Sequence, residues 1–160
     1  MSAAFAASLS LATPDDTARL ARALAPSLAA GDVLLLAGGI GAGKTHFARA
    51  LIQERLSATG RVEDVPSPTY TLVQVYEADA VEIWHADLYR LHGGADLVEL
   101  GLDEAMETAI VLIEWPDRMA ERPAGALALR FLPEGEGRRV EAQSDDARWR
   151  AVWDRALSHV

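Results

Sequence analysis

The residues of this chain best suited to chemistry lie in one glycine-rich stretch. The segment Gly38-Gly39-Ile40-Gly41-Ala42-Gly43-Lys44-Thr45 fits the pattern G-x-x-x-x-G-K-[ST]. Glycines let successive backbone N–H groups turn inward, because no Cβ atom blocks the curl. Such a loop, followed by a helix N-terminus, forms a concave site for anions. The pattern therefore predicts a loop that binds the phosphates of a nucleotide.

Lys44 is the single lysine of the chain, and the other fourteen basic residues are arginines. A lysine ammonium is compact enough to bridge the β- and γ-phosphates of ATP, whereas a guanidinium is too bulky and planar for that place. The hydroxyl of Thr45 is suited to Mg²⁺. The alternative is a glycine-rich turn with an incidental lysine. The nucleotide site expected from this stretch consists of Gly39, Ile40, Gly41, Ala42, Gly43, Lys44, Thr45 and His46.

An acid follows the second long apolar run of the chain. Residues 109–113 read as a buried strand, and Glu114 comes directly after them. In open α/β sheets, ligands bind at the carboxyl ends of the strands, and a strand-end acid there binds Mg²⁺ directly or through water. We therefore predict that Glu114 and Thr45 are the metal ligands. The alternative is a glutamate that faces solvent at the end of its strand.

Two further segments carry polar side chains that could join this site. His85 and Asp87 alternate along a β-rich run, so both would face the same side of a strand. Two ligands are too few for a metal site of their own. Asp87 could orient an attacking water or bind a hydrated Mg²⁺, or it could form a structural hydrogen bond. Ser67-Pro68-Thr69 could be a loop that senses the γ-phosphate, or a plain loop.

The elements expected to position these residues alternate between strands and helices. The helix that begins near Thr13 carries a capping hydroxyl, then proline and acids in its first turn. The other expected elements are a short strand at 8–11, a strand at 33–37, a helix at 44–57, a hairpin of 69–75 and 80–84 about 77–79, one or two short helices within 98–106, a strand at 109–115, a hairpin of 126–132 and 138–143, and a last helix from about 144. With the glycine-rich loop, they predict a P-loop NTPase-like, three-layer α/β/α fold with a mixed central sheet and β-hairpin insertions.

Composition limits the class of protein. The chain has 160 residues, a formal net charge of −9 and no cysteine, which excludes thiolate metal sites and cysteine nucleophiles. No apolar run reaches the length of a membrane span, and the first residues lack the positive charge of a signal peptide. We expect one domain over residues 1–160, located in the cytoplasm. With this negative net charge, the sequence shows no basic surface by which the chain would bind RNA without a partner.

Four segments, taken together, resemble one family. They are GGIGAGKT, PSPTYTLV, HADLYRL and LIEWPDR, in this order. The glycine-rich loop alone is generic, but with the other three segments it resembles the TsaE family, also called YjeE. The resemblance implies an ATPase that binds ATP with Mg²⁺ and hydrolyses it slowly alone. It also implies action with the proteins TsaB and TsaD to form threonylcarbamoyl-adenosine at position 37 of tRNA, which would be contacted only through that complex.

The resemblance also implies roles for individual residues. Lys44, Asp87 and Glu114 would be catalytic, with Thr45 and Glu114 on the Mg²⁺. His85 would be a neighbour of the site. Thr69 would belong to a switch-like loop at the nucleotide, and Pro14 would border the adenine. Two residues depart from the family pattern. Gly39 stands where members usually carry Asp or Asn, and His46 stands where they usually carry Thr. These departures bear on hydrolysis rate and metal affinity more than on nucleotide binding.

Two other functions use the same loop. A small-molecule kinase would need an acceptor pocket and usually a lid with arginines, and the second half of the chain, rich in predicted hairpins, offers no clear lid. A docking module would use nucleotide to switch a partner without significant hydrolysis. We expect an ATPase that acts with partner proteins, as the resemblance implies. No arginine stands out as a finger within the chain itself, so we expect slow turnover until a partner completes the site. Catalysis of phosphoryl transfer is mainly positioning and charge stabilisation.

Overall fold

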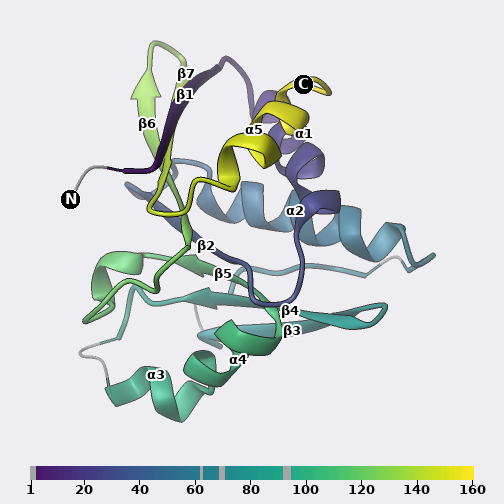
Figure 1. Cartoon of the computed structure of the whole chain (residues 1–160), viewed down its shortest axis with the longest axis vertical. Coiled ribbons are helices and arrows are strands. Elements are labelled where there is room, and N and C mark those ends of the chain that lie inside the picture. Colours follow the sequence, from purple (N-terminus) through teal and green to yellow (C-terminus); the bar gives the residue numbers. More distant parts are fainter. Residues whose placement is uncertain (1–2, 62, 69–70, 92–94) are drawn as a thin grey trace.

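The computed structural model describes residues 3–61, 63–68, 71–91 and 95–160. In this part of the chain, seven strands form one mixed sheet in the order β1-β7-β6-β2-β5-β4-β3 (Figure 1). The strands are β1 (Phe5–Leu11), β2 (Val33–Gly38), β3 (Val73–Ala78), β4 (Val81–Asp87), β5 (Ile110–Glu114), β6 (Leu127–Glu134) and β7 (Gly137–Ser144). β6, β2, β5 and β4 run parallel, whereas β1, β7 and β3 extend the sheet with antiparallel pairing. The mixed sheet expected from the sequence is confirmed.

Helices cover both faces of the sheet and complete the predicted three layers (Figure 1). On one face lie α1 (Pro14–Leu24), α2 (Lys44–Ser57) and α5 (Trp149–Leu157), and on the other lie α3 (Ala95–Leu100) and α4 (Leu102–Thr108). Two short 3-10 helices follow α1 and β5, at Ala25–Ser27 and Pro116–Arg118. The core is divided accordingly into a larger cluster under α1, α2 and α5 and a smaller one under α4. No helix among the described residues is long and apolar enough to cross a membrane.

The central strands are apolar on both faces because both faces are covered. All five residues of β5 are buried, and so are the first four of β2. A strand between two helical layers needs such a continuous apolar run. β1 and β7, nearer the open edge, alternate buried and exposed side chains instead. Because helices cover both faces of the central strands, Glu114 at the end of β5 is buried inside the protein.

The start of α1 follows its sequence signals. The side chain of Thr13 accepts a hydrogen bond from the backbone N–H of Asp16, and the Asp16 carboxylate accepts one from the N–H of Thr13. Pro14 occupies the first helical position, where its missing N–H leaves no helical hydrogen bond unmade. This reciprocal capping box fixes where the chain leaves β1 and enters the helical layer.

Several predicted boundaries were wrong. β1 begins at Phe5 rather than at residue 8, and β3 begins at Val73 rather than at residue 69. The tight turn of the β3–β4 hairpin is Asp79-Ala80, not 77–79, because Glu77 and Ala78 still pair with β4 and Asp79 takes the positive φ of 64°. The last helix begins at Trp149, not near Ser144. Acidic side chains in the intervening segment bind backbone N–H groups instead: Asp145 accepts from Gly125, and Asp146 accepts from Arg148. These local hydrogen bonds compete with helix formation.

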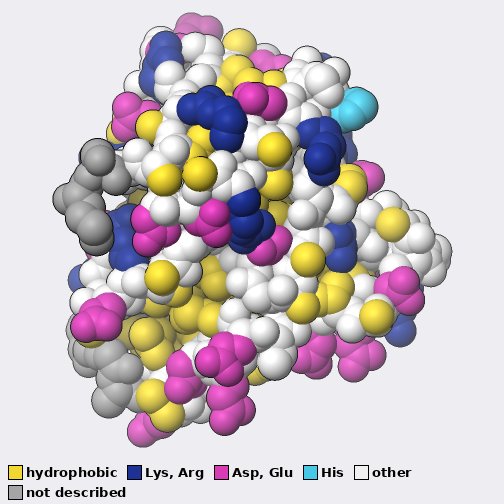
Figure 2. All heavy atoms as spheres, viewed as in Figure 1, with side chains coloured by type: hydrophobic (Ala, Val, Ile, Leu, Met, Phe, Trp, Pro, Cys, Tyr) yellow, Lys and Arg dark blue, Asp and Glu magenta, His cyan; other side chains and the backbone are white. Residues whose placement is uncertain are grey.

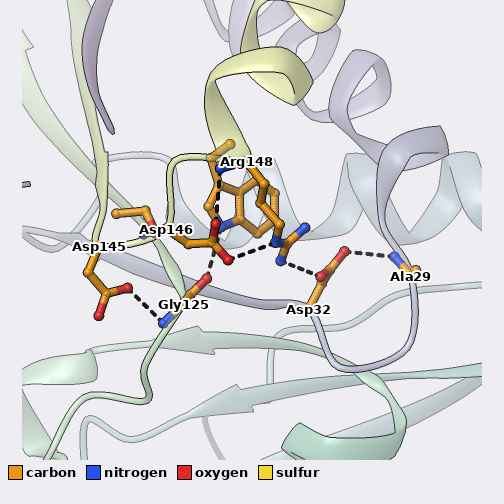
Figure 3. A network of polar contacts seen from close by, with 8 residues as sticks. Ala29, Asp32, Gly125, Asp145, Asp146 and Arg148 are labelled. Atoms are coloured by element: carbon orange, nitrogen blue, oxygen red, sulfur yellow. Dashed lines mark hydrogen bonds and ion pairs between the residues drawn. The ribbon is translucent and has the colours of Figure 1, made fainter. Parts of the chain in front are cut away.

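The same segment carries a polar network that ties the end of the chain to the sheet (Figure 3). Arg148 donates to the Asp32 carboxylate at 2.6 Å and to Asp146 at 3.2 Å, and Asp32 also accepts from the N–H of Ala29 at 2.8 Å. Asp32 is buried and directly precedes β2. The network therefore holds the amino end of β2, opposite the end that leads into the glycine-rich loop.

Charge is unevenly distributed over the face seen in Figure 2. Acidic side chains gather over α4, in the lower part of that view, and basic side chains are interspersed with acids in the upper part. The exposed acids of α4 are Asp103, Glu104 and Glu107. This group of acids therefore lies on the helical layer opposite α2.

Candidate functional site

The candidate site lies at the carboxyl ends of three adjacent parallel strands. In the strand register, Glu114 of β5 pairs with Leu36 of β2 on one side and with Asp87 of β4 on the other. β2 then continues into the glycine-rich loop and α2. Sequence segments far apart are thus brought to one edge of the sheet, as the sequence predicted for Glu114 and the loop.

The glycine-rich loop takes backbone shapes that need glycine. Gly38 has φ +144°, and a Cβ atom there would lie 2.7 Å from the carbonyl oxygen of Phe131. Gly43 has φ +107° and is the N-cap of α2, with no side-chain hydrogen bond capping the helix. The first-turn amides of α2 therefore have no side chain competing for them, and the positive end of the helix dipole faces the loop.

Lys44 is buried inside the loop that it follows. Its Nζ atom donates to the carbonyl oxygens of Gly38 at 2.7 Å and Gly39 at 2.8 Å, and it lies 4.1 Å from the ring centroid of Trp115. Burial lowers the pKa of the Lys44 ammonium, although the carboxylates of Glu114 and Asp87 oppose that shift. The only lysine of the chain is therefore a partly desolvated cation, and two nearby carboxylates stabilise its charge.

Thr45 and Glu114 are in direct contact. The Thr45 hydroxyl lies 2.9 and 3.0 Å from the two carboxylate oxygens of Glu114. Nε2 of His85 lies 2.7 Å from Oε2 of the same carboxylate. Glu114 is 2% exposed and His85 is fully buried. The predicted metal ligands thus meet, and the solvent-facing alternative for Glu114 is wrong.

Asp87 lies next to Glu114 on the neighbouring strand and is also buried. Its Oδ1 atom accepts a hydrogen bond from the N–H of Tyr89 at 2.9 Å. This bond is the structural role that the sequence left open, and it coexists with a place in the site. Asp87 and Glu114 are therefore two carboxylates on one edge of the sheet, facing the ammonium of Lys44.

These residues surround a cavity of about 480 Å³. Its lining residues are Ile40, Gly41, Ala42, Gly43, Lys44, Thr45, His46, Asp87, Tyr89, Glu114 and Trp115. Gly39 and Pro14 are not among them, but Pro14 is adjacent, because its carbonyl oxygen lies 2.9 Å from Nε2 of His46. Thr69 lies outside the described residues. The structure thus brings together most of the residues predicted from the sequence.

A larger cavity, of about 960 Å³, shares Trp115 with this one. Strands β1, β6 and β7 form most of its wall, and Trp115 and the first two residues of the glycine-rich loop, Gly38 and Gly39, also line it. It lacks the helix N-terminus, Lys44 and the buried carboxylates. We therefore assign the functional site to the smaller cavity, where the groups able to bind phosphate and metal converge.

Three residues of the site environment were not predicted from the sequence. Trp115 has a left-handed backbone, φ 59° and ψ 53°, which turns its ring over Lys44 and against Tyr89 at 4.8 Å between centroids. Arg138, at the start of β7, donates to the carbonyl oxygen of Gly41 at 3.1 Å. Trp115 was missed because a non-glycine residue at positive φ leaves no clear pattern in the sequence. Arg138 was missed because it lies near the loop only when the strands have assembled into the sheet.

The layers, the parallel central strands and the loop between β2 and α2 define a P-loop NTPase-like α/β protein. The solved structure of YdiB from Bacillus subtilis has this fold: it superposes with a TM-score of 0.76 over 97% of this chain and 96% of that one, at 23% identity. A family model described as "Threonylcarbamoyl adenosine biosynthesis protein TsaE" matches residues 11–140. The chain belongs to the TsaE family, a family of threonylcarbamoyl-adenosine biosynthesis.

Individual relatives agree with this assignment. Proteins named "tRNA threonylcarbamoyladenosine biosynthesis protein TsaE" are 41% identical over 107 residues in Rickettsia conorii and 37% identical over 134 residues in a Nostoc species. The Nostoc match covers 81% of this chain and 80% of that protein. The Rickettsia match covers 67% of this chain but only 59% of its relative, so this chain spans about three fifths of that protein.

Proposed function

We propose that this protein binds and hydrolyses ATP with Mg²⁺, in support of threonylcarbamoyl-adenosine formation at position 37 of tRNA, together with the proteins TsaB and TsaD in the cytoplasm. The observation that carries the proposal is the convergence of Lys44, Thr45 and Glu114 in one cavity at the N-terminus of α2. With a net charge of −9, the chain would reach tRNA through its partners.

Phosphate binding would use groups that the loop already presents. The first-turn amides of α2 and the Lys44 ammonium form a positive concavity, in which Nζ exchanges the carbonyl oxygens of Gly38 and Gly39 for phosphate oxygens. Trp115 lies over the ammonium and limits the access of water to it. Each exchanged partner is an oxygen acceptor, so the lysine keeps hydrogen-bond partners throughout.

The donor set fits Mg²⁺. A hydroxyl and a carboxylate in contact, with a second carboxylate on the next strand, are hard oxygen ligands of the kind that Mg²⁺ takes together with substrate phosphates. The described residues contain no cluster of three or more acidic or histidine side chains that would bind a metal without a substrate. Thr45 and Glu114 would hold the ion, which when bound neutralises charge on the β- and γ-phosphates.

Hydrolysis would then depend on orientation. Asp87 projects from β4 beside Glu114, and its carboxylate can accept a hydrogen bond from the water that attacks the γ-phosphate. Lys44 stabilises the charge that spreads over the phosphate oxygens. Such positioning, rather than covalent chemistry, supplies most of the catalysis in phosphoryl transfer. Slow turnover by the chain alone follows if a partner must complete the site.

The test is phosphate release from Mg-ATP by the purified chain, with and without its TsaB and TsaD counterparts. We expect low activity that rises many-fold with the partners and is lost in Lys44→Ala. Glu114→Ala should keep nucleotide binding and lose hydrolysis, whereas Glu104→Ala, the same change at an exposed acid of α4, should behave as wild type.

Other outcomes would point elsewhere. Turnover that Lys44→Ala leaves intact would exclude this site. Unchanged binding and hydrolysis in Glu114→Ala would favour a nucleotide-gated docking module. Phosphate transferred to an added metabolite, in place of free phosphate, would identify a small-molecule kinase. A rate indifferent to TsaB and TsaD would remove the partner-dependent part of the proposal.

A further inference from the structure

The site contains a buried histidine that the proposed reaction does not use. His85, in the middle of β4, is fully buried, and its Nε2 atom lies 2.7 Å from Oε2 of Glu114. The side chains of His85 and Glu114 point to the sheet face covered by α2, because their same-face neighbours Ile83 and Leu112 pack in the core cluster beneath that helix. A buried imidazole thus contacts a buried carboxylate immediately behind the cavity.

We infer that His85 is a positioning residue, which fixes the orientation of the Glu114 carboxylate for Mg²⁺ binding. The inference rests on the proposed function in one respect, namely that Glu114 is a metal ligand. His85 does not line the cavity and would touch neither nucleotide nor metal. It would act through Glu114, as a hydrogen-bonded partner behind a metal ligand does in many metal sites.

The hydrogen bonds of Glu114 explain why a second donor is needed. Both of its carboxylate oxygens accept from the Thr45 hydroxyl, and Oε2 also accepts from His85. When the Thr45 oxygen serves Mg²⁺, its hydroxyl no longer holds both oxygens of the glutamate. Among the described residues, His85 is then the donor whose hydrogen bond to Glu114 stays unchanged. A carboxylate with one oxygen fixed from behind presents the other to the cavity in a defined direction.

The chemistry of the imidazole defines the variants that can test this. Nδ1 of His85 is buried and has no hydrogen-bond partner among the described residues, so only Nε2 carries the interaction. The amide N–H group of glutamine can occupy roughly the place of Nε2, whereas that of asparagine reaches only the place of Nδ1. His85→Gln therefore keeps the donor, and His85→Asn removes it with a similarly polar, neutral side chain.

The experiment measures how Mg²⁺ changes the affinity for a fluorescent ADP analogue and for ATP, in wild type, His85→Gln, His85→Asn and His85→Ala. Circular dichroism and thermal unfolding select the variants that fold. Without Mg²⁺, we expect affinities close to that of wild type. With Mg²⁺, the ion concentration for half-maximal effect should rise by about 10- to 100-fold in His85→Asn and His85→Ala, and His85→Gln should recover much of the loss.

Two results would overturn the inference. One is a magnesium dependence in His85→Asn equal to that of wild type. The other is an equal loss of Mg²⁺-free nucleotide binding in the glutamine and asparagine variants, which would mean that His85 only maintains the fold. Failure of the proposed function is separate. If wild type binds nucleotide more tightly with Mg²⁺ but never hydrolyses it, the ATPase proposal fails. The role of His85 is then still tested by the Mg²⁺ dependence of nucleotide affinity in its variants. If Mg²⁺ has no effect on wild type, both fail.

Discussion

The hydroxyl of Thr45, in the first turn of α2, lies 2.9 and 3.0 Å from the two carboxylate oxygens of Glu114 at the end of β5. The two residues are 69 positions apart in the sequence, and the parallel pairing of β2 with β5 brings their elements together. The contact joins the glycine-rich loop to the strand-end acid. In the proposed function, this contact is where Mg²⁺ would couple to the nucleotide.

Replacing Thr45 tests this coupling directly. Thr45→Val keeps the shape of the side chain but removes the hydroxyl, so we expect the gain in nucleotide affinity caused by Mg²⁺ to disappear and hydrolysis to fall by roughly 10-fold or more. Thr45→Ser keeps the hydroxyl and should retain most of both. Titration of nucleotide at several Mg²⁺ concentrations measures the effect. A valine variant as responsive to Mg²⁺ as wild type would contradict the assignment.

The pH dependence of nucleotide binding should report the ionisation of Lys44. Burial lowers its pKa, and the ammonium form is the one that binds phosphate, so affinity should fall as pH rises through a pKa below that of free lysine. Between the lowered pKa of Lys44 in the folded protein and its ordinary pKa in the unfolded chain, the unfolded chain holds more protons. In this pH range the free energy of unfolding should therefore rise with pH. Because Lys44 is the only lysine, one ¹³Cε resonance follows its titration. A resonance that titrates like free lysine would exclude the buried cation.

The glycine-rich loop offers a matched pair of substitutions. A Cβ atom at Gly38 would lie 2.7 Å from the Phe131 carbonyl oxygen, whereas nothing lies within 4 Å of one at Gly39. Gly38→Ala should cost about 2 kcal/mol or more, by overpacking and strain, and should lower the unfolding temperature by about 4–8 °C. Gly39→Ala should leave stability nearly unchanged. Thermal unfolding of both variants checks this, and equal losses would contradict it.

How much of the site could be predicted depends on the range of the signal. The loop, Lys44, Thr45 and the strand-end Glu114 carry local patterns, because glycine spacing and apolar runs are read within a few residues. Trp115 and Arg138 do not. The first depends on a strained backbone angle, and the second depends on β7 lying beside β6 and β1 near the loop. Helix starts were predicted where a cap marked them, at Thr13, and missed where acidic side chains formed turns before α5.

Arg138 should help to hold the glycine-rich loop. It donates to the carbonyl oxygens of Gly41 and Gly137, at 3.1 and 2.9 Å, and so connects the β6–β7 hairpin to the loop. Arg138→Ala should lower nucleotide affinity by about 3- to 10-fold, as expected for the loss of one hydrogen bond to a carbonyl group. The neighbouring Arg139 pairs with Glu134 instead, and Arg139→Ala is the control. Equal affinities in the two variants would remove this role.

The network of Arg148, Asp32 and Ala29 lies at the amino end of β2, away from the glycine-rich loop. It should contribute to stability and not to nucleotide binding. Arg148→Ala would leave the buried carboxylate of Asp32 with the Ala29 N–H as its remaining partner among the described residues. We expect a loss of about 1–2 kcal/mol, because Arg148 itself is half exposed and its ion pairs are partly screened by solvent. Arg155→Ala, at an exposed site of α5, is the matched control and should change stability by less than about 0.5 kcal/mol. Denaturant unfolding and nucleotide titration of both variants separate the two effects. A large fall in affinity without a fall in stability would show that the network acts on the loop across the whole length of β2.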